Sequence, residues 1–143
     1  MVFVRDTGSV YNAPLEDVWR FMSDREAHSM AHRHRNPERK PIGDTSGIYS
    51  WEQDFDGKPE RFSMRWTSFP LFGIAYEVLE GPFVGSRFFV YYQPRRAQTR
   101  VTVVGDFLSP TIPEARIEAS ILGFFALEFD QDNAAISARS ASK

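Results

Sequence analysis

The chain has 143 residues, 42% hydrophobic and 25% charged, which is the size and balance of one globular domain with its own core. The formal net charge is only −2, so no basic field attracts nucleic acid or anionic lipid. Cysteine is absent, which excludes disulfides, thiolate metal sites and cysteine nucleophiles. We therefore expect a single domain over residues 1–137 that does not bind nucleic acid.

The N-terminal segment lacks the basic stretch and apolar core of a secretory signal. The longest apolar run, residues 119–127, is about half of the length that a membrane-spanning helix needs. These features predict a soluble, cytoplasmic protein with no stable membrane insertion.

Residues 2–11 are rich in β-branched and aromatic side chains and stop at Pro14, which predicts a strand. A short helix follows, with Glu16 in its first turn and an apolar face that includes Val18 and Met22. Asp24 is a plausible cap for a second short helix that ends near Ser29.

Residues 31–107 alternate with a period of two between turn signals, which predicts five or six antiparallel strands. The strongest hairpin signal is Asp56-Gly57. A long helix is predicted from about Thr111 to Ser137, covered nearly all round in its middle, and a flexible tail over residues 138–143. Gly123 inside this helix leaves room for a ligand or allows close packing on the sheet.

Three segments resemble the START-like or SRPBCC superfamily, which includes polyketide cyclases, lipid-transfer domains and the birch-pollen-allergen fold. They are SVYNAPLEDVWRF at residues 9–21, VLEGP at residues 78–82 and TRVTVVGDF at residues 99–107. The resemblance implies an α+β helix-grip fold, in which a curved antiparallel β-sheet wraps around a long C-terminal α-helix and two short helices follow the first strand. It also implies an internal pocket for lipids, sterols, polyketides or other apolar molecules.

The segment that follows the second short helix contains His32 and His34. If it is extended, His32, His34 and Asn36 share one side, and the arginines between them take the other side. Because arginine is costly to bury, the histidine side is expected to face the interior. There the histidines either bond to neighbouring backbone, orient the polar end of a ligand or move a proton.

A metal site is not expected, because His28 is assigned to a different element and no carboxylate stands at a recognisable ligand spacing from the histidines. No cofactor is expected either.

Aromatic residues share faces of the two strands on either side of the Asp56 turn. They form either a pocket wall or an ordinary core, and if they line a pocket, Tyr49 and Trp51 supply hydrogen-bond donors. The candidate ligand-binding residues are His32, His34, Tyr49, Trp51, Met64, Trp66, Ile121 and Phe125.

The leading functional hypothesis is binding or transport of a small hydrophobic or amphipathic ligand such as a lipid, quinone or polyketide. The alternative is a polyketide cyclase/dehydratase-like or hydrolase-like enzyme in which His32 or His34 is the general base. A third hypothesis is a protein-interaction module, because residues 88–92 are apolar on both faces of their strand. The outer of these faces is covered either by a second copy in a homodimer or by the loop around Leu71.

Overall fold

The computed structural model describes residues 1–141, which form one antiparallel sheet and three helices. The strands are β1 (Val2–Tyr11), β2 (Arg35–Gly43), β3 (Ser46–Phe55), β4 (Lys58–Phe69), β5 (Gly73–Glu80), β6 (Arg87–Arg95) and β7 (Gln98–Phe107). The helices are α1 (Leu15–Ser23), α2 (Arg25–Ala31) and α3 (Glu114–Ala141). The predicted order of elements is confirmed, with six strands between α2 and α3.

The seven strands lie in the order β1-β7-β6-β5-β4-β3-β2. Strands β2 to β7 therefore form a meander, and β1 returns to pair with the last strand of the chain. The predicted hairpin is confirmed: Asp56 and Gly57 both have positive φ, as a tight turn between twisted strands requires, and Phe55 pairs with Lys58.

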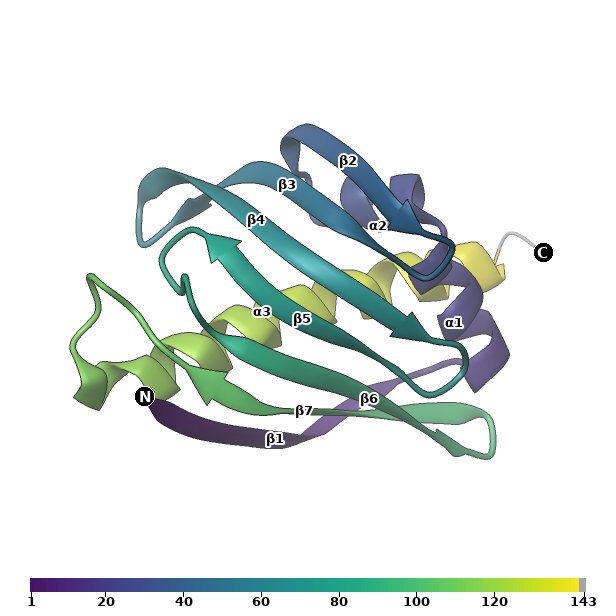
Figure 1. Cartoon of the computed structure of the whole chain (residues 1–143). Helices are drawn as coiled ribbons and strands as arrows, with labels where there is room; N and C mark the ends of the chain where they lie inside the picture. Colours follow the sequence, from purple (N-terminus) through teal and green to yellow (C-terminus); the bar gives the residue numbers. More distant parts are fainter. Residues whose placement is uncertain (142–143) are drawn as a thin grey trace.

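Helix α3 lies across the concave face of the sheet, which wraps around it (Figure 1). Its buried side chains recur every three or four residues and so form one face. They are Ile117, Ile121, Phe125, Phe129, Asp132 and Ile136.

The expectation that the middle of α3 is covered nearly all round is wrong, because Ala126 and Leu127 are exposed. Gly123 is exposed as well, and a Cβ built on it would meet no atom within 4 Å, so neither ligand clearance nor tight packing accounts for this glycine. The helix also continues four residues beyond the predicted end, from Ser137 to Ala141, through residues expected to be a tail. Residues 142–143 of that predicted tail lie outside the described residues.

Helices α1 and α2 lie beside the C-terminal half of α3 (Figure 1). Pro14 precedes α1, and Val18, Phe21 and Met22 bury its apolar face in the core. The predicted cap of α2 is confirmed, since the Asp24 carboxylate accepts a hydrogen bond from the Ala27 backbone N–H. Helix α2 contacts α3, and the pocket described below lies where the two helices meet.

The outer face of β6 is covered from within the chain. Phe72, in the turn before β5, packs with its ring centroid 5.8 Å from that of Phe89 and 4.9 Å from that of Tyr91. Its carbonyl oxygen also accepts a hydrogen bond from the Tyr92 backbone N–H. Of the two expected covers the loop is therefore present, and the homodimer remains a prediction. Among the described residues, no helix is long and apolar enough to cross a bilayer.

Candidate ligand pocket and its histidine cluster

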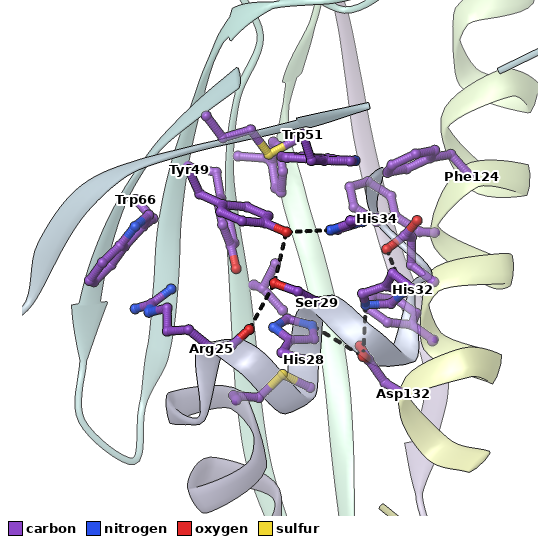
Figure 2. A pocket seen from close by; sticks show the side chains of 18 of the residues that line it. Arg25, His28, Ser29, His32, His34, Tyr49, Trp51, Trp66, Phe124 and Asp132 are labelled. Atoms are coloured by element: carbon purple, nitrogen blue, oxygen red, sulfur yellow. Dashed lines mark hydrogen bonds and ion pairs between the residues drawn. The ribbon is translucent and has the colours of Figure 1, made fainter. Parts of the chain in front are cut away.

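A pocket of about 110 Å³ lies between the sheet, α2 and α3. Strands β3 and β4 supply aromatic side chains on one side, while α2 and α3 supply polar side chains on the other, together with phenylalanines from α3 such as Phe124 (Figure 2). The lining residues are Met22, Arg25, His28, Ser29, His32, His34, Tyr49, Trp51, Met64, Trp66, Tyr76, Phe88, Val90, Tyr92, Phe124, Phe125, Glu128, Phe129 and Asp132.

Both His32 and His34 line this pocket, but for a different reason from the one predicted. His32 is the C-cap of α2, and His34 precedes β2, so the two are not alternate residues of one strand. Arg33 between them has a φ of 53°, in the left-handed region, and the two imidazoles stack with centroids 5.2 Å apart. The expectation for Asn36 is wrong: it is exposed, has a φ of 48°, and bonds to Glu52.

Asp132 of α3 lies between His28 and His32 (Figure 2). Its Oδ1 atom is 3.1 Å from His28 Nε2 and 2.8 Å from His32 Nε2. Neither contact is aligned as a hydrogen bond, so Oδ1 is buried with no hydrogen-bond partner among the described residues. Its Oδ2 atom accepts a hydrogen bond of 3.1 Å from the Tyr11 hydroxyl. His28 and His32 thus stand one helical turn apart on α2, contrary to the expectation that they belong to different elements.

The second ring nitrogen of His32 is also engaged. Its Nδ1 lies 2.9 Å from Glu128 Oε2 and 2.7 Å from Gln131 Oε1. Burial disfavours the charged imidazole, but Asp132 and Glu128 together outweigh it and raise the pKa of His32 to about 11. Burial likewise opposes ionisation of Asp132, yet the imidazoles of His28 and His32 hold the pKa of Asp132 well below its usual range.

His34 has the opposite electrostatic environment. Burial, reinforced by the neighbouring His32 and His28, lowers the pKa of His34 to about 3, so its ring is neutral at pH 7. Its Nδ1 is 2.7 Å from the Tyr49 hydroxyl, which donates a 2.8 Å hydrogen bond to Ser29 Oγ. With that donor used, Tyr49 accepts from His34, so Nδ1 carries the proton and Nε2 is an acceptor. Nε2 is buried and makes no aligned hydrogen bond among residues 1–141, although the side chain of Gln53 interacts with the ring and raises its pKa slightly against the effect of burial.

The aromatic wall is a continuous stack of rings. His34 lies on Trp51 at 4.6 Å between centroids, and Trp51 lies between Tyr49 and Phe62 at 5.0 and 5.2 Å. At the rim, the Arg25 guanidinium sits 3.4 Å above the ring of Trp66, a cation–π contact. The pocket is therefore mostly aromatic along the sheet and part of α3, and its polar groups are concentrated where α2 meets α3.

The structure brings together seven of the eight predicted ligand-binding residues: His32, His34, Tyr49, Trp51, Met64, Trp66 and Phe125. Ile121 does not line this pocket. It lies one turn before Phe125 on α3 and faces a separate apolar void of about 10 Å³, where side chains already fill the space. Of the two predicted donors, the Trp51 indole N–H is occupied by Gln53 Oε1 at 2.6 Å.

The prediction missed the residues that organise the polar side, above all His28, Glu128 and Asp132. Two signals were present in the sequence. His28 and His32 have the spacing that places side chains on one helix face, and so do Glu128 and Asp132. Asp132 moreover falls on the face of α3 that is otherwise apolar, between Phe129 and Ile136.

Neither the protein-family models nor the curated protein sequences contain a match to this chain. Solved structures do match. The Zhui aromatase/cyclase from Streptomyces sp. R1128 is 17% identical with a TM-score of 0.74, over 98% of this chain and 93% of that one. Ara h 8.0201 is 9% identical with a TM-score of 0.74, over 96% and 98% of the two chains. TTHA0849 from Thermus thermophilus is 20% identical with a TM-score of 0.64, over 96% and 92%.

At such low identities these similarities establish the fold and leave the activity open. Each covers nearly the whole chain, from β1 through α3. The chain therefore has the helix-grip fold that its sequence motifs predict.

Proposed function

We propose that this protein binds a small molecule with an apolar body and a polar end in the pocket between the sheet and α3. The observation that carries the proposal is that aromatic rings from the sheet and from α3 line most of the pocket, while its polar groups gather where α2 meets α3. Apolar walls with a few fixed polar groups are typical of small-molecule sites.

The size of the pocket narrows the class of ligand. Its volume of about 110 Å³ is smaller than the engineered cavity of roughly 150 Å³ that holds benzene. A single substituted ring is therefore the size that fits with small adjustments of the walls. A lipid or a polyketide would extend beyond this volume toward solvent.

His34 supports a specific polar contact. Its neutral ring is held by Tyr49 on one side and by Trp51 on its face, so the orientation of the imidazole is set before a ligand arrives. The unpartnered Nε2 atom would gain a hydrogen bond from a hydroxyl or amide N–H of the ligand. His32 cannot serve this purpose, because both of its ring nitrogens already face carboxylates.

A thermal-shift panel tests the proposal, with single-ring phenols and anilines, naphthols, quinones and fatty acids as probes. A ligand at 100 times its Kd should add about 2.7 kcal/mol to the free energy of unfolding. We expect the largest shift for single-ring phenols. His34→Gln should weaken a phenol more than it weakens toluene, and Phe72→Ala, on the outer face of the sheet, should weaken neither. No shift with any probe would contradict the proposal.

The free nitrogen of His34 is the basis of a second candidate function, proton abstraction from an enolisable ligand, in which a pKa of about 3 makes His34 a weak base. The matched structures include aromatase/cyclases, among them the Zhui protein and one half of the StfQ di-domain from the steffimycin biosynthetic pathway, which is 12% identical with a TM-score of 0.72. Deuterium exchange at the α-carbon of aryl ketones, followed by NMR, tests this candidate. Exchange should exceed buffer and fall in His34→Gln, and equal rates in both proteins would exclude it.

A further inference from the structure

Three potential metal ligands converge where α2 meets α3. His28 and His32 stand one turn apart on α2, and Asp132 faces both of them from α3 (Figure 2). Their ligand atoms all lie within 4.8 Å of one another. We propose that His28, His32 and Asp132 form a binding site for a first-row divalent transition metal ion such as Zn²⁺.

The distances between the ligand atoms suit such an ion. Zn²⁺ binds histidine nitrogen and carboxylate oxygen at about 2.1 Å, which places neighbouring ligands of a tetrahedral site roughly 3.4 Å apart. Asp132 Oδ1 lies 3.1 Å from His28 Nε2 and 2.8 Å from His32 Nε2. These two contacts have to open by less than about 1 Å, and the two imidazole nitrogens, which lie within 4.8 Å of each other, have to take up a similar spacing. Two imidazoles with one carboxylate leave at least one coordination position free.

The neighbours of the proposed ligands orient them as second groups around metal ligands commonly do. His32 presents Nε2 to the site while its Nδ1 faces Glu128 and Gln131, the pattern in which a carboxylate orients a ligating imidazole. Asp132 presents Oδ1 while its Oδ2 accepts from the Tyr11 hydroxyl. Two of the three ligands are thus oriented by contacts from outside the site.

The contacts of Asp132 Oδ1 are close but are not aligned as hydrogen bonds. Asp132 is 5% exposed, and its Oδ1 atom has no aligned hydrogen bond among the described residues although two imidazoles lie beside it. The ion pairs with His28 and His32 compensate the charge of this buried oxygen, and a cation placed between the three atoms would bind the oxygen and both nitrogens directly.

The charge of the cluster and its access from solvent are also compatible with a divalent cation. Asp132 and Glu128 bring two negative charges to a site in which both histidine ligands are neutral when they bind metal. A divalent cation makes this sum zero. His28 is 24% exposed whereas His32 is 3% exposed, so an ion can reach the site from solvent past His28.

Metal titration of the tag-free, chelator-treated protein tests the proposal without any knowledge of the pocket ligand. We expect Zn²⁺ and Co²⁺ to bind with a stoichiometry of one. Bound Co²⁺ should show the strong visible absorption bands of a four-coordinate site. Mg²⁺ and Ca²⁺, which prefer more oxygen ligands, should not compete. In NMR spectra of the imidazole nitrogens, Zn²⁺ should shift the Nε2 signals of His28 and His32 and leave those of His34 near their original positions.

Variants separate this site from the ligand proposal. His28→Gln removes a partly exposed ligand, so the protein should fold, and it should weaken Zn²⁺ binding at least 100-fold. Glu128→Ala, which removes one partner of His32, should weaken it about 10-fold. His34→Gln is the matched control, because it lines the same pocket but does not face Asp132, and it should bind Zn²⁺ like the wild type while losing affinity for phenols.

Two results would overturn the proposal. One is the absence of saturable Zn²⁺ or Co²⁺ binding below millimolar concentrations. The other is binding that His28→Gln leaves unchanged and His34→Gln removes. In the first case His28, His32 and Asp132 would be an ion-pair cluster only, and the ligand proposal would stand unaffected.

Discussion

The two ends of the space between sheet and α3 are both buried, but they are held together in different ways. At the apolar end, Phe62, Phe83, Phe107 and Ile121 close around a void of about 10 Å³. At the other end, histidines and carboxylates meet, and a pocket of about 110 Å³ remains. One sheet and one helix thus enclose a filled core and a pocket side by side.

The difference follows from the directionality of the contacts. Apolar side chains pack in any orientation that removes voids, so an apolar interior closes to high density. Imidazoles and carboxylates are held at defined distances and angles by their partners, and they cannot collapse further without losing those contacts. The polar end is therefore the part of the molecule that can keep space for a ligand.

The largest effect on stability should come from truncating a side chain in the apolar end. Phe107 is fully buried, and Phe107→Ala should lower the free energy of unfolding by about 3–5 kcal/mol in urea denaturation at any pH between 5 and 8. Phe3 on the adjacent strand β1 is 64% exposed, so Phe3→Ala is a matched control that should cost well under 1 kcal/mol. Equal losses in the two variants would mean that the apolar end is not a packed core.

At the polar end, Asp132→Asn should cost about 3 kcal/mol in the metal-free protein. The change keeps the shape of the side chain but removes one of the two negative charges that the buried His32 faces and leaves only Glu128, and the loss of a buried ion pair is destabilising. Asp130 lies two residues earlier on the exposed side of α3, and Asp130→Asn should change stability by less than about 0.5 kcal/mol. A loss below about 1 kcal/mol for Asp132→Asn would show that the cluster contributes little to the fold.

The pH dependence of stability should distinguish the two ends. The pKa of His32 is raised to about 11 in the folded protein and is ~6.5 in the unfolded chain, so its contribution is complete below pH 6.5 and is lost as the pH rises toward 11. Between pH 7.5 and 9, below the titration of tyrosine, the metal-free protein should lose about 1–2 kcal/mol. Urea denaturation at several pH values should show that the free energy of unfolding falls with pH in the wild type and in Phe107→Ala. If His32→Gln shows the same fall, the pH dependence does not come from His32.

The smallest effect tests a position that belongs to neither end. Gly123→Ala should stabilise the protein by about 0.5–1 kcal/mol, because a Cβ on this exposed helical residue meets nothing and alanine loses less conformational freedom on folding. Thermal denaturation by circular dichroism is sufficient to measure it. Destabilisation would contradict the view that Gly123 is an exposed helical position with free space around it.

Local patterns were enough to predict much of the fold. The period of two between Ala31 and Phe107, the Asp56-Gly57 turn and the uninterrupted C-terminal helix each depend on neighbouring residues only. The aromatic wall was predictable for the same reason, since Tyr49 and Trp51 share a strand face in any regular strand.

The polar side of the pocket was not predictable in the same way, and His32 shows why. Its position at the end of α2, and not within a strand, depends on where that short helix stops and on the left-handed Arg33, which local propensity leaves open. Its partner Asp132 is 100 residues away in the chain.

The sequence by itself determined the helix-grip architecture and the aromatic face, because both follow from the periodicity of neighbouring residues. Only the tertiary structure decided that His28, His32 and Asp132 meet, and that Ile121 belongs to the filled core and not to the pocket. The physical reason is that a contact between two helices depends on their packing angle and depth, to which the whole sheet contributes.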